Sequence, residues 1–200
     1  MKAFRIAGYE AVPVVETVEL PRPGPGEVRV RVAAASLNPL DVKLQRGFMH
    51  AYFPLGFPYT LGTDLSGTVD ATGGGVSGWA PGDRVVARTA PTRGGAIAEF
   101  ALVPADQLVR VPDAIAFEQA AGIPTAAGTA WQALFEAAAL REGQTVLIHA
   151  GAGSVGSFAI QFAKQAGARV VATASGDGLA IARRLGADLV IDHRNDRRHV

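Results

Sequence analysis

Residues 145–156 join an apolar run to a glycine-rich turn: Thr145-Val146-Leu147-Ile148-His149-Ala150-Gly151-Ala152-Gly153-Ser154-Val155-Gly156. The first five residues predict a buried strand of the parallel type. The last six match G-x-G-x-x-G, and a helix is expected over residues 154–166. In this pattern the first glycine permits a tight turn, the second lets a pyrophosphate approach the backbone, and the third lets the helix pack closely. The N–H groups at the helix start then face the phosphates, which predicts a dinucleotide site.

The segments that follow the glycine loop extend this pattern. Strands are expected over residues 169–173 and 189–192, with a helix over 179–185 between them. The order β-α-β-α-β is half of a doubly wound nucleotide-binding domain. The sequence therefore predicts an incomplete Rossmann domain in the second part of the chain.

The end of the second expected strand bears on the choice of cofactor. NAD sites carry Asp or Glu there to hold the ribose 2′-hydroxyl, whereas this chain has Thr173-Ala174-Ser175-Gly176. Ser175 can donate a hydrogen bond to a phosphate, so NADPH is favoured over NADH. Asp177 lies close by. The nearest cations are those of Arg183, Arg184 and Arg194.

The part of the chain before the glycine loop predicts strands and turns. Residues 27–32 alternate charged residues with valine, which is typical of a half-buried strand. Further short strands are expected over residues 65–69, 84–88 and 98–103, which together indicate a β-barrel or sandwich. The composition changes near Pro112, and helices are expected over residues 117–122 and 129–140. We therefore predict two domains, residues 1–123 and 124–200.

The composition narrows the class of function. The 200 residues are 48% hydrophobic and carry a net charge of +1, so nucleic-acid and membrane partners are not expected. Without cysteine, the chain has no disulfide, thiolate zinc site or cysteine nucleophile, and no metal is expected from its four histidines, whose spacing fits no ligand set. The first residues lack the apolar run of a signal peptide, which favours a cytoplasmic location.

One other chemistry fits part of the same loop. Ser154 lies in a sequence that approximates the nucleophile elbow of serine hydrolases, with alanine in place of the first glycine. Asp188 or Asp192 would have to act with His193 or His199. The extra glycine, Gly151, is better explained by phosphate binding. No G-K-[S/T] follows the loop, so nucleoside triphosphate hydrolysis is not supported.

Several separate motifs resemble the zinc-free quinone oxidoreductase (zeta-crystallin-like) branch of the medium-chain dehydrogenase/reductase superfamily. They lie at residues 35–41, 58–69, 82–85, 95–100 and 127–131. The resemblance implies a GroES-like β-barrel domain followed by the Rossmann half. Zinc-dependent relatives have Gly-His-Glu in the place of Gly62-Thr63-Asp64, which agrees with the absence of zinc ligands here.

The resemblance also implies roles for single residues near the reacting groups. Asn38 and Thr129 would lie near the nicotinamide, although Asn38 before Pro39 is equally a candidate helix cap. Asp41 would orient the same loop or cap it. Other pocket positions have either a site role or an ordinary turn or packing role: Tyr52, Phe53, Thr63 and Asp64.

The remaining expected cofactor contacts come directly after the three strands expected in the second part of the chain. They are the loop residues Gly151, Ala152, Gly153, Ser154, Val155 and Gly156, then Ser175, His193 and Arg194. The last two lie where this branch often has a tyrosine or a cation near the NADPH phosphate.

The reaction implied is hydride transfer from NADP(H) to a small quinone or an α,β-unsaturated carbonyl, without a metal. Relatives commonly dimerise through the far edge of the nucleotide-binding sheet, which this chain does not reach, so the resemblance leaves a homo-oligomer open. The alternative is a non-catalytic nucleotide-binding or truncated relative, since complete members of the family are longer. A chain that ends after the third strand would leave residues 146–148 at an exposed sheet edge.

Overall fold

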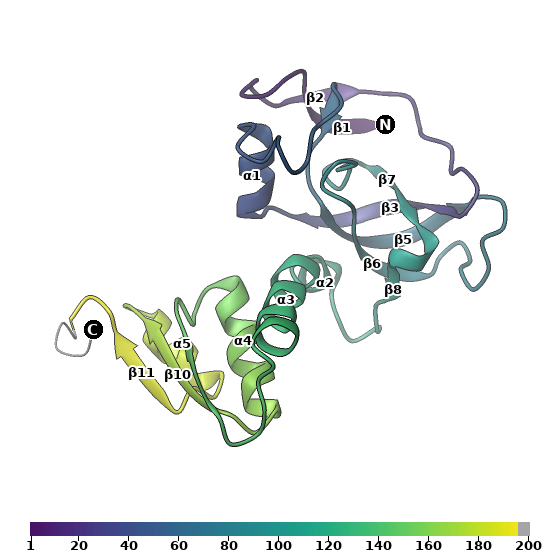
Figure 1. Cartoon of the computed structure of the whole chain (residues 1–200). Helices are drawn as coiled ribbons and strands as arrows, with labels where there is room; N and C mark the ends of the chain where they lie inside the picture. The colour runs from purple at the N-terminus through teal and green to yellow at the C-terminus, as the bar shows by residue number, and fades with distance from the viewer. Residues whose placement is uncertain (196–200) are drawn as a thin grey trace. The chain divides into compact units, whose positions relative to one another are not determined.

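The computed structural model describes residues 1–195, which form two compact units. The first unit spans Met1–Thr125, and the second begins at Ala126 (Figure 1). This division lies two residues beyond the boundary predicted from the sequence, and helix α3 (Pro124–Trp131) crosses it. Each unit has its own hydrophobic core, so each is described separately.

The larger sheet of the first unit has five antiparallel strands in the order β7-β3-β5-β6-β8. Alternation produces its core: in β3 the side chains of Val28 and Val30 are fully buried, while Arg31 faces solvent. The strand is longer than expected because it pairs with β5 as far as Ser36 opposite Asp64. The strands are β3 (Glu27–Ser36), β5 (Asp64–Thr72), β6 (Arg84–Arg88), β7 (Phe100–Pro104) and β8 (Leu108–Arg110).

A smaller sheet, in the order β2-β1-β4, completes the first unit. Its strands are β1 (Lys2–Ile6), β2 (Val14–Thr17) and β4 (Tyr59–Thr60), none of which was expected from the sequence. Three short helical segments join the strands: α1 (Pro39–Gln45), η1 (Ala105–Gln107) and α2 (Phe117–Ala121).

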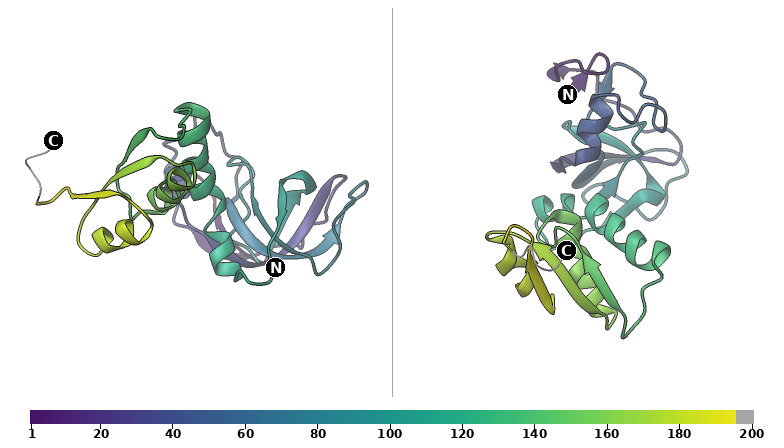
Figure 2. Two further views of the ribbon diagram at one scale, coloured as in Figure 1. Left: turned by 90° about the horizontal axis from the view of Figure 1, so that it is seen from below. Right: turned by 60° about the vertical axis from the view of Figure 1, so that its left-hand side comes forward.

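The second unit contains a parallel sheet in the order β11-β10-β9. Its strands are β9 (Thr145–Ile148), β10 (Arg169–Ala174) and β11 (Leu189–Asp192), joined by helices α4 (Ser154–Gln165) and α5 (Gly178–Arg184), as Figure 2 shows. Both crossovers step in the same direction along the sheet, so right-handed connections place both helices on one face. Ile160 of α4 and Ala182 of α5 accordingly share one buried cluster with Val170 and Ala172 of β10. The structure confirms a β-rich first domain followed by half of a doubly wound fold.

The segment before β9 differs from the expected helix over residues 129–140. Helix α3 begins at Pro124 and continues into a π-helical stretch, η2 (Gln132–Ala137). Proline suits the first turn of a helix because its missing N–H would have no partner there. Strand β9 lies at one edge of the described sheet, and the Leu147 side chain is 53% exposed. Among the described residues, no helix has both the length and the apolar character needed to cross a membrane.

Candidate functional site

The glycine loop connects β9 to α4, and steric limits explain each glycine. A Cβ at Gly156 would lie 2.3 Å from the Ala150 carbonyl oxygen, so the helix start packs directly on the loop. At Gly151 a Cβ would lie 2.9 Å from the Ala172 Cβ. Gly153 is exposed, with only the Ala150 oxygen near its missing side chain, at 3.2 Å. The loop therefore leaves an uncovered stretch of backbone where a phosphate is expected to approach.

The residue with left-handed backbone in this loop is Ala150, with φ of 52°, and not Gly151. The prediction that Gly151 provides the tight turn is therefore wrong. Gly151 is needed because its backbone lies close to Ala172 of β10. Non-glycine residues rarely adopt a positive φ, and such strain persists only where the surroundings impose it. The Thr173 hydroxyl receives the Ala150 N–H at 3.2 Å, and the Thr173 carbonyl receives the Gly151 N–H at 2.8 Å. This role of Thr173 was not expected from the sequence, although a polar residue among the apolar residues of a strand was a signal.

The carboxyl ends of the three parallel strands meet at the edge that carries the glycine loop. Ser175 follows β10 there, and His193 and Arg194 follow β11, with the His193 N–H donating to the Ala174 carbonyl at 3.2 Å. These three predicted cofactor residues are thus at the same edge. Arg183 and Arg184 end helix α5, which runs back from this edge, so they lie towards the opposite end of the sheet.

The turn after β11 is fixed by Asp192. Its carboxylate accepts the backbone N–H of Arg194 at 3.1 Å and the side-chain amide of Asn195 at 2.8 Å. These two hydrogen bonds lower the pKa of Asp192, the Arg194 bond most. Asp192 holds the turn that presents His193 and Arg194, and both of those side chains are exposed.

Ser154 is the first residue of α4, and its side chain forms no hydrogen bond with a histidine within residues 1–195. His149, the nearest histidine in the sequence, contacts the Thr173 hydroxyl at 3.2 Å. His199 lies outside the described residues. The described loop thus provides the backbone geometry of a phosphate site and no arrangement that would activate a serine.

In the first unit, Asn38 occupies the position before helix α1, where a capping residue is expected. Its side chain does not cap the helix: the Nδ2 group donates to Asp64 Oδ2 at 3.0 Å and to Ser36 Oγ at 3.3 Å. The reciprocal bond is made by Asp41, whose Oδ2 accepts the Asn38 backbone N–H at 2.7 Å. Asp41 therefore fixes the loop, and the Asn38 amide is held by the start of β5.

Asp41 is 2% exposed, and its Oδ1 atom has no hydrogen-bond partner in the described chain. Burial raises the pKa of Asp41. The Asn38 N–H opposes the rise, and the charge of Asp64 adds to it. Asp41 also borders an apolar hollow of about 220 Å³ whose lining includes Phe4, Leu37 and Leu61.

The other predicted pocket residues are spread over both units. Thr63 is completely buried, and its hydroxyl has no partner in the described chain. Tyr52 is 76% exposed in the turn after α1, while Phe53 is partly buried. Thr129 lies on α3 in the second unit and is exposed.

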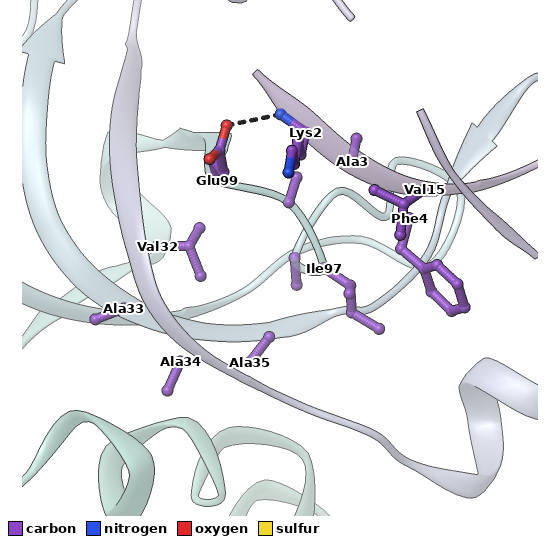
Figure 3. A pocket seen from close by; sticks show the side chains of 12 residues that line it. Lys2, Ala3, Phe4, Val15, Val32, Ala33, Ala34, Ala35, Ile97 and Glu99 are labelled. Atoms are coloured by element: carbon purple, nitrogen blue, oxygen red, sulfur yellow. Dashed lines mark hydrogen bonds between the residues drawn. The ribbon is translucent and has the colours of Figure 1, made fainter. Parts of the chain in front are cut away.

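A larger hollow of about 360 Å³ opens beside strand β1 (Figure 3). Its lining is mostly small and apolar, with Ala33, Ala34 and Ala35 of β3 facing Ile97 and Phe4. At its rim Glu99 accepts the backbone N–H of Lys2 at 2.7 Å. The hollow provides apolar surface on the strand that leads to Asn38.

The described residues hold no group of three or more His, Asp or Glu side chains placed to bind a metal ion. They do fit a dinucleotide. The uncovered backbone at Gly153 and the start of α4 would hold the pyrophosphate, and Ser175, His193 and Arg194 would lie towards the adenosine ribose. The chain offers no carboxylate between Thr173 and Gly176 for the ribose 2′-hydroxyl.

Comparison with known proteins gives two family matches. Residues 24–113 match the alcohol dehydrogenase GroES-like domain, and residues 154–200 match the zinc-binding dehydrogenase domain. The chain is 38% identical over 193 residues to the chloroplast envelope quinone oxidoreductase homolog of Arabidopsis thaliana, covering 94% of this chain and 57% of that protein.

Solved structures agree with these matches. An NAD-dependent alcohol dehydrogenase superposes with a TM-score of 0.90 at 38% identity, covering 97% of this chain and 64% of that one. A mycobacterial protein solved in complex with NADPH superposes with a TM-score of 0.86 at 34% identity, covering 96% and 58%. The chain thus spans less than two thirds of the length of each of these relatives.

Proposed function

Because the chain belongs to the quinone oxidoreductase branch of the medium-chain dehydrogenase/reductase superfamily, we propose that it is an NADPH-dependent reductase of quinones or α,β-unsaturated carbonyls. The observation that carries the proposal is the loop from Ala150 to Gly156. Its strained backbone is held by Thr173, and it leaves the peptide at Gly153 uncovered beside the start of α4. That arrangement suits a pyrophosphate.

Bound NADPH would supply the hydride. The N–H groups at the start of α4 bind negative charge, helped by the positive end of the helix dipole. Asp192 keeps the turn after β11 in place, so that the exposed Arg194 is available to a phosphate. No side chain in the described site stands out as a proton donor, so we assign the proton to solvent, and most of the rate to the positioning of cofactor and acceptor.

The preference for NADPH over NADH rests on the end of β10. An acidic residue there would bind the ribose 2′-hydroxyl and repel a 2′-phosphate. Ser175 occupies the place instead and is only partly buried, while Arg194 follows the neighbouring strand. The similarity to one structure solved with NADPH and to one NAD-dependent enzyme leaves the choice to the site itself.

A fluorescence titration of this chain with NADPH and with NADH tests the proposal, followed by NADPH oxidation in the presence of a quinone. We expect tighter binding of NADPH than of NADH, and quinone-dependent oxidation. Failure to bind either cofactor would overturn the proposal. Tight binding without oxidation would identify a non-catalytic nucleotide-binding relative instead.

A further inference from the structure

The imidazole of His149 is fixed at the end of β9 by the same hydroxyl that holds the glycine loop. His149 directly follows β9, and its Nδ1 atom lies 3.2 Å from Thr173 Oγ1. That oxygen also receives the Ala150 N–H at 3.2 Å. These three residues lie together at the carboxyl ends of β9 and β10, and doubly wound folds bind their ligands at this edge of the sheet.

These contacts determine which ring nitrogen of His149 carries the hydrogen. A hydroxyl has one hydrogen to donate. Thr173 Oγ1 accepts the Ala150 N–H, and within residues 1–195 the other group in contact with it is His149 Nδ1. With hydrogen on Nδ1, the hydroxyl hydrogen would have no acceptor in the described chain. Nδ1 is therefore the acceptor, and the exposed neutral ring presents an N–H donor at Nε2.

The composition of the loop shows what this donor adds. Residues 145–156 contain no lysine, arginine, aspartate or glutamate, so His149 is the one side chain among them that can carry a positive charge. In residues 150–156 the one polar side chain is that of Ser154. A phosphate site in this loop is otherwise built from backbone N–H groups, and His149 stands directly beside it.

We propose that His149 is a further cofactor-binding residue, which donates a hydrogen bond from Nε2 to a phosphate oxygen of the dinucleotide. The inference rests on the proposed function, because it uses the same glycine loop. Phosphate oxygens are anionic acceptors, and hydrogen bonds to them are stronger than those between neutral groups. The contact with Thr173 orients the ring before the ligand arrives, which lowers the entropy lost on binding.

The hydrogen on the imidazole can be located without any cofactor. In a chain labelled with ¹⁵N-histidine, long-range ¹H–¹⁵N correlations distinguish a protonated ring nitrogen from an unprotonated one. His149→Gln identifies the signals among those of the four histidines. At about pH 8.5, where ordinary histidines are neutral, we expect the His149 hydrogen on Nε2. Hydrogen on Nδ1 in the wild-type chain would overturn the proposal, and this measurement needs no variant to fold in altered form.

Two variants of Thr173 test the cause of this tautomer. Thr173→Val removes the hydroxyl and should mix in the other tautomer of His149. Thr173→Ser keeps the hydroxyl and should leave the ring signals as they are in the wild type. Ring signals that Thr173→Val leaves unchanged would show that the hydroxyl does not orient the imidazole, which contradicts the proposal.

Cofactor binding separates the outward donor from a purely structural role. In His149→Asn the side-chain oxygen lies near the Nδ1 position, so it can still accept from Thr173, but no donor reaches outward. In His149→Gln the NH₂ group lies near the Nε2 position. We expect His149→Asn to weaken NADPH binding about tenfold, the range for loss of a hydrogen bond to a charged group, and His149→Gln to stay within about threefold of the wild type.

His50→Asn is the matched control, because His50 is an exposed histidine of the first unit, and it should leave NADPH binding unchanged. A loss in His149→Gln that equals or exceeds the loss in His149→Asn would show that His149 acts only as a support for Thr173. That result would overturn the proposal, as would wild-type affinity in His149→Asn.

Inorganic pyrophosphate and adenosine, used as separate probes, identify the part of the cofactor that His149 contacts. We expect the His149 Nε2 signal to move with NADPH and with pyrophosphate but not with adenosine, while the His50 signals stay in place. A shift with adenosine and none with pyrophosphate would overturn the phosphate assignment. If NADPH binds without moving the signal, this inference alone fails. If no dinucleotide binds, the proposed function fails with it, while the tautomer still shows what Thr173 does to His149.

Discussion

The Thr173 hydroxyl lies 3.2 Å from the backbone nitrogen of Ala150, the residue of the glycine loop that has a positive φ. The Thr173 carbonyl also accepts the N–H of Gly151, so one residue of β10 holds two consecutive peptides of the loop. Strain in a loop persists only where its neighbours fix it. Thr173 is therefore the support that keeps the phosphate-binding backbone in shape before any cofactor arrives.

Removing this hydroxyl should loosen the loop. We expect Thr173→Val to lower the free energy of unfolding by about 1–2 kcal/mol, because it leaves the Ala150 N–H without its partner. NADPH binding should weaken several-fold. Urea unfolding and a fluorescence titration measure the two effects. Thr173→Ser keeps the hydroxyl and should restore most of the affinity. Thr68→Val, on a strand of the first unit, is the matched control and should leave binding unchanged.

The glycines of the loop should differ in what an added methyl group does. Gly156→Ala places a Cβ 2.3 Å from the Ala150 oxygen, so we expect a loss of stability of more than about 2 kcal/mol. Gly153→Ala meets only the same oxygen at 3.2 Å and should fold, but it should bind NADPH less tightly. Thermal unfolding and cofactor titration separate the two outcomes.

Gly128→Ala is the control for these substitutions. Gly128 lies within α3, and nothing lies within 4 Å of an added Cβ there. Alanine is the better helix former by about 1 kcal/mol, so stability should rise while cofactor affinity stays the same. A Gly156→Ala chain as stable as the wild type would contradict the close packing described for the loop.

The sequence was sufficient to predict the strands and helices around the glycine loop, because each follows from a local pattern. Residues 145–148 are apolar, residues 151–156 carry the glycines, and strand β11 has the predicted bounds. The sequence did not reveal which loop residue has the left-handed backbone. That depends on contacts with β10. These contacts bring Ala172 and Thr173, which follow helix α4 in the sequence, against the loop.

The hydrogen bonds of Asp64 were also beyond prediction from local patterns. Its partners come from three places in the fold, because Ser36 ends β3, Asn38 precedes α1 and Thr125 lies on α3. One signal was present: Asp64 is a charged residue next to Leu65 at the start of a strand whose first four residues are buried. A buried charge requires partners, and their identity is a property of the tertiary fold.

The choice between the two dinucleotides should depend on the residue after β10. We expect Ser175→Asp to place a carboxylate where the ribose 2′-hydroxyl of NADH is bound, and to repel the 2′-phosphate of NADPH. The ratio of the two dissociation constants should move towards NADH by about tenfold or more. Ser77→Asp adds the same charge at an exposed position of the first unit and should not change the ratio. An unchanged ratio in Ser175→Asp would place the ribose site elsewhere.

The pH dependence of stability should have opposite signs for two aspartates. Burial raises the pKa of Asp41 above its ordinary value of 3.8, so the folded chain holds this proton more tightly than the unfolded chain. Stability from this group is therefore present below that value and is lost as pH rises through the raised pKa. Asparagine at position 41 does not titrate. The free energy of unfolding of the Asp41→Asn chain should therefore increase relative to that of the wild type as pH rises between about pH 4 and pH 7.

Asp188 provides the opposite case. The backbone N–H of Val170, at 2.6 Å, is the main cause of its lowered pKa, and Lys164 adds a second hydrogen bond. Its contribution is lost as pH falls through the lowered pKa and is fully present above the ordinary value of 3.8, so the wild type should become more stable relative to Asp188→Asn as pH rises to about 4. This change lies below the pH range in which Asp41→Asn becomes more stable relative to the wild type. Urea unfolding of the three chains from about pH 2 to pH 7 measures both effects. Parallel pH profiles for the two variants would show that Asp41 is not held as a buried acid beside Asn38.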